Sequence, residues 1–204
     1  MSRRILTGIT TTGIPHIGNY FGAIKPALQL SSEKNVSSYF FLADLHAIIK
    51  QTNPNEIKVS VNEVALAWLS SGLDPEKSFF YRQSNIPEIT ELAWILSCVT
   101  AKGLINRSHA YKAAVQLNHD HTKDEDKGIS MGLFSYPVLM AADILMFNSS
   151  HVPVGKDQLQ HLEITRDIAE KFNHQYGNTF VIPEAIINKD GKLLVGHDGR
   201  KMSK

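Results

Sequence analysis

Segments with strand-like and helix-like hydrophobic periods alternate along the first half of the chain, and this alternation constrains the fold more than any other feature. The run at 38–45 is almost continuously apolar, as a strand in a parallel sheet covered on both faces requires. The helix that Pro54 opens carries an apolar stripe and ends at Gly72. We predict strand 4–8, helix 17–32, strand 38–45, helix 55–71, strand 78–82 and a helix that begins behind Pro87. This order predicts an α/β fold with a doubly wound, mostly parallel sheet.

The second half of the chain is less regular. Between 102 and 127 the hydrophobic pattern weakens, and the charged run at 123–127 is typical of a solvated loop. The later elements that we predict are helix 136–148 behind Pro137, strand 152–154, a helix over 157–176 that Asp157 caps and Gly177 ends, and a hairpin turn at 189–192.

Charge and cysteine content narrow the classes of protein to which the chain belongs. Its 204 residues include 21 Lys and Arg and 20 Asp and Glu, so a net charge of +1 provides no field that holds a polyanion non-specifically. The single cysteine, Cys98, excludes an internal disulfide and a thiolate metal cage and fits a reducing compartment. Asp143 interrupts the longest apolar run, and the N-terminus has no stretch long enough for a signal peptide. We therefore expect a cytoplasmic protein that does not enter a membrane.

A glycine-bearing loop joins the first predicted strand to the first predicted helix. Doubly wound folds bind phosphates at this position, although the spacing is neither that of a dinucleotide fingerprint nor that of a P-loop. His16 and Asn19 stand one helical turn apart with Gly18 between them, so both side chains could donate to a phosphate that lies close to the backbone. The alternative is that the two side chains only cap a helix.

Two short motifs at opposite ends of the chain resemble a known pair of signatures. His16-Ile17-Gly18-Asn19 resembles the "HIGH" signature of the class I aminoacyl-tRNA synthetases, and residues 201–204, Lys-Met-Ser-Lys, resemble their "KMSKS" signature without its final serine. Together and in this order the two motifs are a specific signal. The two lysine ammonium groups suit a polyphosphate, the alternative being an ordinary basic tail.

Three further blocks, 18–24, 132–145 and 152–161, resemble the tryptophanyl members of that family. The resemblance covers the chain from about residue 5 to its end and implies a Rossmann-like catalytic domain. It also implies an ATP-dependent ligase that activates L-tryptophan to tryptophanyl-adenylate with release of pyrophosphate and then transfers it to tRNA(Trp). Three alternatives remain open: a tyrosyl enzyme of the same fold, a nucleotidyltransferase with a different substrate, and a non-catalytic fragment that only binds ATP or tryptophan.

Asp143 points to tryptophan on physical grounds as well. It has apolar neighbours on both sides in the sequence, and a buried carboxylate is costly without a donor. An indole N–H is a donor only, and a phenyl ring would leave the carboxylate unpaired, so an apolar slot with this one acceptor selects tryptophan over phenylalanine. The alternative is that Asp143 pairs with a lysine or a backbone group.

The resemblance implies roles for further residues. His16, Asn19, Lys201 and Lys204 would neutralise charge on the leaving pyrophosphate. The ATP contacts implied are Thr10, Thr11, Thr12, Gly18, Asn19, Gly155, Lys156, Asp157, Leu193, Lys201, Met202, Ser203 and Lys204. The amino-acid contacts implied are Tyr136 and Gln158 at the ammonium and carboxylate end, Asp143 at the indole nitrogen, and Met140, Leu6, His46, Val152 and Val154 around the ring. The three threonines stand where the family more often has Gln-Pro-Ser, and their hydroxyls can still donate to phosphate.

Metal, domain and partner expectations complete the prediction. Mg²⁺ would enter with ATP, held by phosphates and water, and we interpret His119-Asp120-His121 as a surface loop and expect no protein metal site. The domain that we predict spans 1–196, with a helical connective insertion at about 85–130, followed by the signature loop 197–204. The resemblance implies that a helical anticodon-binding domain is absent, so that this fragment is limited to substrate binding or activation, and that it forms a homodimer through the segment around 94–112.

Overall fold

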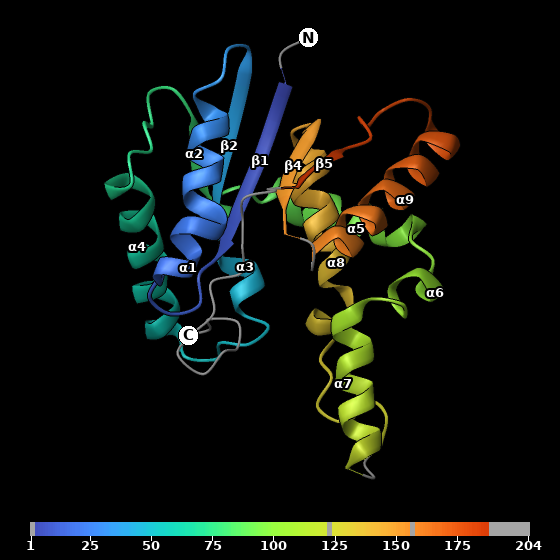
Figure 1. Ribbon diagram of the computed structural model, residues 1–204. Helices are drawn as coiled ribbons and strands as arrows, with labels where there is room; N and C mark the ends of the chain where they lie inside the picture. Colours follow the sequence, from blue (N-terminus) through green and yellow to red (C-terminus); the bar gives the residue numbers. More distant parts are fainter. Residues whose placement is uncertain (1–2, 122–123, 156–157, 188–204) are drawn as a thin grey trace. The chain divides into compact units, whose positions relative to one another are not determined.

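The computed structural model describes residues 3–121, 124–155 and 158–187, and the chain divides into two compact units (Figure 1). The first unit consists of 1–86, 149–156 and 184–204, and the second of 87–148 and 157–183. The predicted insertion at about 85–130 lies largely in the second unit, which extends well beyond it.

The described part of the first unit contains a parallel sheet of five strands in the order β3-β2-β1-β4-β5. Its strands are β1 (Arg3–Thr10), β2 (Val36–Ala43), β3 (Phe79–Arg82), β4 (His151–Val154) and β5 (Glu184–Ile187). All four strand pairs are parallel, so the predicted α/β class is confirmed. The sequence analysis missed β5, whose side chains are mostly exposed and show no alternation.

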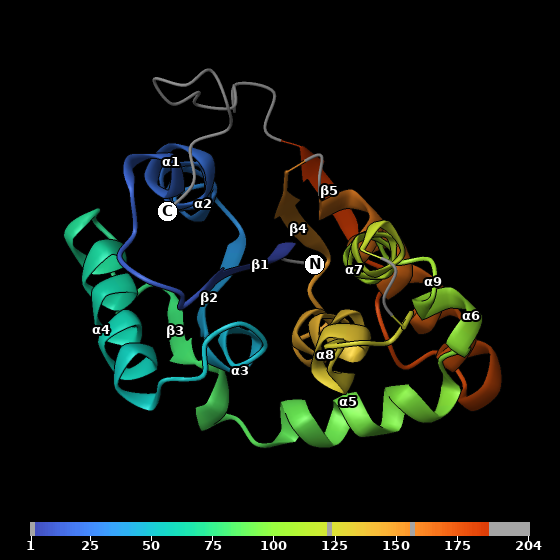
Figure 2. The ribbon, with the colours of Figure 1, turned by 90° about the horizontal axis from the view of Figure 1, so that it is seen from below.

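One face of the sheet is covered by two helical segments, as Figure 2 shows. Phe40 of β2 packs on Trp68 of α4 (Pro54–Ser70), with ring centroids 4.9 Å apart. Ile24 and Ala27 of the first helical segment join the same cluster. Asn53 caps α4 by accepting a hydrogen bond from the Asn55 N–H. Burial of these large apolar side chains stabilises the first unit.

The first helical segment is continuous but changes its pitch. It comprises α1 (Ile17–Asn19), a π-helical turn over Tyr20–Ile24, and α2 (Lys25–Ser31). The Lys25 N–H bonds to the carbonyl of Tyr20, five residues back. Pro26 explains this widening, because its ring has no N–H and collides with the carbonyl four residues earlier in a regular α-helix. The predicted helix is thus present, with a π turn that the sequence analysis did not predict.

The second unit is helical. Its elements are α5 (Glu88–Val99), α6 (Lys102–Ile105), α7 (His109–Asp120), α8 (Met131–Met146) and α9 (Leu159–Tyr176), with α8 in contact with each of the other four. No helix in the described part of the chain is long and apolar enough to span a membrane.

Several boundaries in the second unit differ from the prediction. The interpretation of 119–121 as a surface loop is wrong, because His119 and Asp120 form the last turn of α7. Helix α8 begins five residues before the predicted Tyr136, since Ser130 caps it and Pro137 lies inside it. At the end of α9 the prediction is confirmed: Gly177 adopts a φ of 88° and terminates the helix.

Candidate functional site

The sheet order reverses at β1, which has β2 on one side and β4 on the other. In open parallel sheets ligands bind outside the carboxyl ends of the strands at such a switch point. Thr10 ends β1 and Val154 ends β4, followed directly by Gly155. The first unit therefore brings the predicted nucleotide contacts at 10–12 and Gly155 to one edge of the sheet.

His16 and Asn19 form a reciprocal cap at the start of the first helical segment. The Nδ1 of His16 accepts a hydrogen bond of 3.0 Å from the Gly18 N–H, and the Oδ1 of Asn19 accepts one of 3.0 Å from the His16 N–H. Because Nδ1 is an acceptor, the neutral ring carries its proton on Nε2. The cap thus leaves the Nε2–H of His16 and the Nδ2 amino group of Asn19 as donors that can meet an anion. Capping and anion binding, which the sequence analysis set against each other, are compatible in this geometry.

The loop before this helix is held from two sides. Thr12 donates its backbone N–H to the carbonyl of Thr10 over 3.0 Å, and Gly13 donates to the Oγ of Ser60 on α4 over 2.9 Å. Gly13 has a φ of 69°, a conformation that favours glycine. Thr11 is completely buried and its Oγ1 has no hydrogen-bond partner among the described residues. Of the three threonines, only Thr10 and Thr12 have exposed surface.

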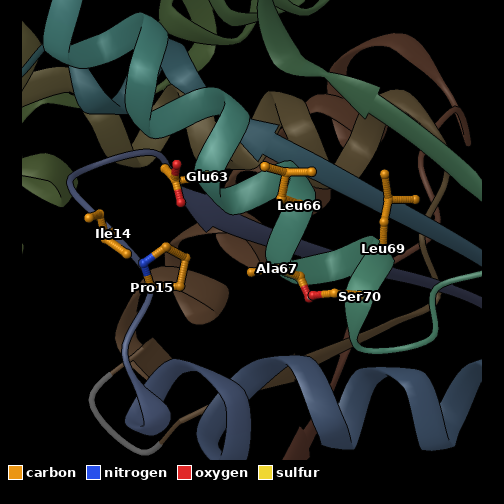
Figure 3. Close-up of a pocket in the computed structure, with 7 residues that line it drawn as sticks. All are labelled: Ile14, Pro15, Glu63, Leu66, Ala67, Leu69 and Ser70. Atoms are coloured by element: carbon orange, nitrogen blue, oxygen red, sulfur yellow. The ribbon is translucent and has the colours of Figure 1, made fainter.

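A groove of about 350 Å³ lies between Ile14 and Pro15 of this loop and the second half of α4 (Figure 3). None of the predicted ATP or amino-acid contacts lies in its lining, so it is separate from the candidate site. Its lining residues are Ile14, Pro15, Glu63, Leu66, Ala67, Leu69 and Ser70.

In the second unit, three predicted amino-acid contacts share one face of α8. Tyr136, Met140 and Asp143 stand at positions i, i+4 and i+7, which lie on the same side of a helix. Asp143 is completely buried, whereas Tyr136 and Met140 are half-buried. The arrangement offers a carboxylate acceptor and a phenol about two helical turns apart. Gln158 is exposed and forms the N-cap of α9 without a side-chain hydrogen bond to it.

Tyr136 has a partner that the sequence analysis did not assign. Its hydroxyl lies 2.8 Å from the Nε2 of His161 on α9, and the two rings meet edge to face with centroids 5.1 Å apart. His161 is buried. Burial raises the pKa of the Tyr136 phenol above its ordinary value of 10.0, so the phenol keeps its proton at neutral pH. The contact joins residues 25 positions apart, and no local pattern signals it.

The remaining predicted amino-acid contacts belong to the first unit. Because Ile5 pairs with His151, Leu6 of β1 faces the same side of the sheet as Val152 and Val154 of β4. All three are buried. His46 lies on α3 (Asp44–Ala47) and is half-buried.

The start of α3 is fixed by a polar network that the sequence analysis also missed. Strand β2, predicted to reach residue 45, ends at Ala43, because the buried Asp44 carboxylate accepts from the backbone N–H and hydroxyl of Ser84 at 3.0 and 2.6 Å. The Nε of Arg82 lies 2.9 Å from the same carboxylate. Leu45 donates its N–H to the Oε1 of the fully buried Gln83. An aspartate directly after a buried strand was the available signal.

Other predicted contacts lie outside the described residues, as does the predicted hairpin turn at 189–192. They are Lys156, Asp157, Leu193, Lys201, Met202, Ser203 and Lys204. Across the described ranges, no group of three or more His, Cys, Asp or Glu side chains could hold a metal ion.

Comparison with known proteins shows the family to which the chain belongs. The family model described as tRNA synthetases class I (W and Y) matches residues 2–204. The tryptophan–tRNA ligase of Bordetella pertussis is 60% identical over 205 residues, which cover 100% of this chain and 46% of that relative. The Neisseria meningitidis enzyme of the same name is 59% identical, covering 99% of this chain and 60% of the relative. The chain thus spans about half the length of the curated relatives that it matches.

Solved structures show the same likeness. Tryptophanyl-tRNA synthetase from Campylobacter jejuni, complexed with ADP and tryptophan, superimposes with a TM-score of 0.87 at 47% identity, covering 98% of this chain and 60% of that one. Tyrosyl-tRNA synthetase from Archaeoglobus fulgidus, complexed with L-tyrosine, has a TM-score of 0.75 at 20% identity over 98% of this chain and 58% of that one, a likeness of fold alone.

Proposed function

Since the chain belongs to the class I tRNA synthetases of the tryptophan and tyrosine group, we propose that it carries the activation chemistry of a tryptophan–tRNA ligase. The proposed reaction joins L-tryptophan to ATP, yielding tryptophanyl-adenylate and pyrophosphate, and the whole protein then transfers the acyl group to tRNA(Trp). The observation that carries the choice of amino acid is the completely buried Asp143 carboxylate on α8. It would accept the indole N–H, which phenylalanine does not have.

The nucleotide would bind at the switch point of the first unit. There the His16 Nε2–H and the Asn19 amino group would donate to the phosphates, beside Gly18, whose missing Cβ allows close approach. Thr10, Thr12 and Gly155 lie at the same sheet edge. ATP enters as its Mg²⁺ complex, the metal being held mainly by phosphate oxygens and water. Further contacts are assigned to Lys156, Asp157, Leu193 and residues 201–204, on the resemblance of these residues to the family's motifs.

The amino acid would bind through α8 and its neighbours. We assign Tyr136 and Gln158 to its ammonium and carboxylate end and Met140 to the indole ring. From the first unit we assign Leu6, His46, Val152 and Val154 to contacts with the ring. An acceptor at the indole nitrogen favours tryptophan over phenylalanine, because a phenyl ring has no N–H to donate to it.

Catalysis in this scheme needs no protein nucleophile. The carboxylate of tryptophan attacks the α-phosphorus of ATP in line, the bond from that phosphorus to the bridging oxygen breaks, and pyrophosphate leaves with the electron pair. The contribution of the chain is to position the two substrates and to stabilise the charge that develops on the leaving group. His16, Asn19, Lys201 and Lys204 are the residues assigned to that charge.

We further propose that the protein acts in the cytoplasm as a homodimer. This proposal rests on the family resemblance and on Trp94 of α5, which is 72% exposed, since aromatic side chains are enriched at protein interfaces. The exposed thiol of Cys98 on the same helix fits a reducing compartment. Equilibrium sedimentation of the wild type and a Trp94→Lys variant tests the dimer, and a monomeric wild type overturns it.

Amino-acid-dependent exchange of labelled pyrophosphate into ATP tests the proposed activation step. We expect exchange with tryptophan and none above background with tyrosine. Exchange that tyrosine supports and tryptophan does not would establish the tyrosyl alternative. Exchange with neither amino acid would overturn activation by this chain, and a titration with tryptophan and ATP would then decide whether it only binds them.

A further inference from the structure

The contact between Tyr136 and His161 carries an inference about how the amino acid is held. The Nε2 of His161 lies 2.8 Å from the Tyr136 hydroxyl, within the range of a good hydrogen bond. His161 is only 5% exposed, and its backbone carbonyl accepts a bond of 2.9 Å from the Thr165 hydroxyl one turn later in α9. Both rings belong to the second unit, on adjacent helices.

The direction of this hydrogen bond follows from the ligand that Tyr136 is proposed to bind. An ammonium group has donors only, so a phenol that contacts it must accept with an oxygen lone pair. The phenol then has to donate its own proton to another group. The Nε2 of His161 stands where that acceptor is needed, provided that the ring is neutral and carries its proton on Nδ1.

We propose that His161 is a positioning residue for amino-acid recognition: its Nε2 accepts the Tyr136 O–H and so orients the phenol oxygen to receive the substrate ammonium. The inference rests on the proposed function and extends it to a residue that touches Tyr136 rather than the substrate. In this proposal Tyr136 and His161 together recognise the α-amino group of tryptophan and no other part of the ligand. Burial raises the pKa of the Tyr136 phenol, so at neutral pH the hydroxyl holds a proton that it can donate.

Two substitutions separate the hydrogen bond from the packing of the rings. His161→Phe keeps an aromatic ring against Tyr136 but removes the acceptor. His161→Gln restores an acceptor as an amide oxygen on a flexible side chain. His174→Gln on the exposed last turn of the same helix is the matched control.

The experiment measures equilibrium binding of two ligands by each variant. Tryptophan carries the ammonium group, and indole-3-propionate is the same molecule without it. We expect His161→Phe to weaken tryptophan binding about tenfold and indole-3-propionate binding less than about twofold, since only tryptophan uses the oriented phenol. His161→Gln should recover part of the loss, and His174→Gln should bind both ligands as the wild type does.

The possible results distinguish failure of the proposed role of His161 from failure of the proposed function. Equal weakening of both ligands by His161→Phe would show a structural role only, and unchanged tryptophan binding would exclude any role; either result overturns the inference. In a Tyr136→Phe background the effect of His161→Phe should vanish, because the two groups act as one unit. If the wild type binds indole-3-propionate but not tryptophan, or neither, the proposed function itself fails.

Discussion

The Oγ of Ser60 accepts a hydrogen bond of 2.9 Å from the backbone N–H of Gly13, a residue 47 positions earlier in the chain. Ser60 is buried on α4, and Gly13 has a φ of 69° in the loop that leads to the His16 cap. The loop therefore takes its conformation partly from a helix that contributes nothing else to the proposed nucleotide site. This relationship makes Ser60 a positioning residue that can be tested.

Replacing Ser60 with alanine removes this acceptor. We expect ATP affinity to fall about three- to tenfold and the free energy of unfolding to fall by about 1 kcal/mol, because the backbone N–H of Gly13 loses a part-buried hydrogen bond. Nucleotide titration and urea unfolding measure the two effects. The control is Ser70→Ala, since Ser70 is exposed on the same helix and bonds only within it. Wild-type ATP affinity in Ser60→Ala would refute the role of Ser60 as a positioning residue.

Asp44→Asn tests the network that fixes the start of α3. The asparagine amino group cannot accept from Arg82 or from the Ser84 hydroxyl, as the carboxylate does at 2.9 and 2.6 Å. We expect the free energy of unfolding to fall by about 2 kcal/mol. The loss is smaller than for a fully buried ion pair, because Arg82 is half-exposed and its guanidinium regains water. Tryptophan affinity should fall as well, since α3 carries His46.

The matched control is Asp74→Asn. Asp74 pairs with Lys77 over 2.8 Å at the exposed surface, and the hydrogen bond from Lys77 lowers the pKa of its carboxyl. Exposed pairs contribute little, so the control should unfold like the wild type. Equal destabilisation by the two substitutions in urea unfolding would contradict the assignment of Asp44.

The sequence was sufficient for features that local physics determines. The parallel βα order followed from hydrophobic periods, and the end of α9 followed from Gly177, whose positive φ costs other residues more. Helix α7 was harder, because half of its apolar residues are alanines and the cap at Ser108 is held by contacts outside the local sequence. Gln160 accepts from the His109 N–H and donates to the Arg107 carbonyl, 51 and 53 residues away.

The contacts of the candidate site also divide into local ones, which the sequence indicates, and long-range ones, which it does not. The cap of His16 by Asn19 is local and was visible as a spacing of three residues. The partners Ser60, His161 and Arg82 are not local, because the tertiary fold alone brings them to Gly13, Tyr136 and Asp44. Sequence patterns therefore propose residues that touch substrate, but they do not identify the residues that hold Gly13, Tyr136 and Asp44 in place.

Pro26→Ala tests the cause of the π turn at Tyr20–Ile24. Alanine restores an N–H and removes the clash of the proline ring, so the segment should return to α-helical pitch. Ile24 and Ala27 would stay in the core. Residues before the turn would then rotate about the helix axis by about 100°, which is the rotation per residue of an α-helix. We expect ATP affinity to fall about tenfold, because His16 and Asn19 change direction, while thermal stability stays equal or rises. Pro54→Ala, at the first turn of α4 where proline is tolerated, should leave ATP affinity unchanged.

Tyr136 should make the protein sensitive to alkaline pH. Burial raises the pKa of its phenol in the folded state above 10.0. Below the unfolded pKa both states hold the proton, and as pH rises past it the unfolded chain loses the proton first, so the free energy of unfolding falls. Because desolvation also raises the pKa of Tyr111, the comparison is made in a Tyr111→Phe background. There, ultraviolet absorbance of tyrosinate should show a late-titrating phenol that Tyr136→Phe removes and Tyr176→Phe leaves in place. Loss of the late signal in both variants, or in neither, would contradict the assignment.

Asp143→Asn distinguishes a recognition role for the buried carboxylate from a folding role. An asparagine of the same shape can present its amide nitrogen where the indole N–H donor would arrive, and two donors repel. We expect tryptophan affinity to fall at least tenfold and ATP affinity by less than about twofold, because the charge-assisted hydrogen bond serves the amino acid alone. Binding titrations of each variant with tryptophan and with ATP measure the two changes in affinity. Asp167→Asn, an exposed aspartate on α9, is the control and should change neither. Equal losses for both ligands would mean that Asp143 stabilises the second unit rather than the substrate, and the choice of tryptophan would then have to come from other contacts.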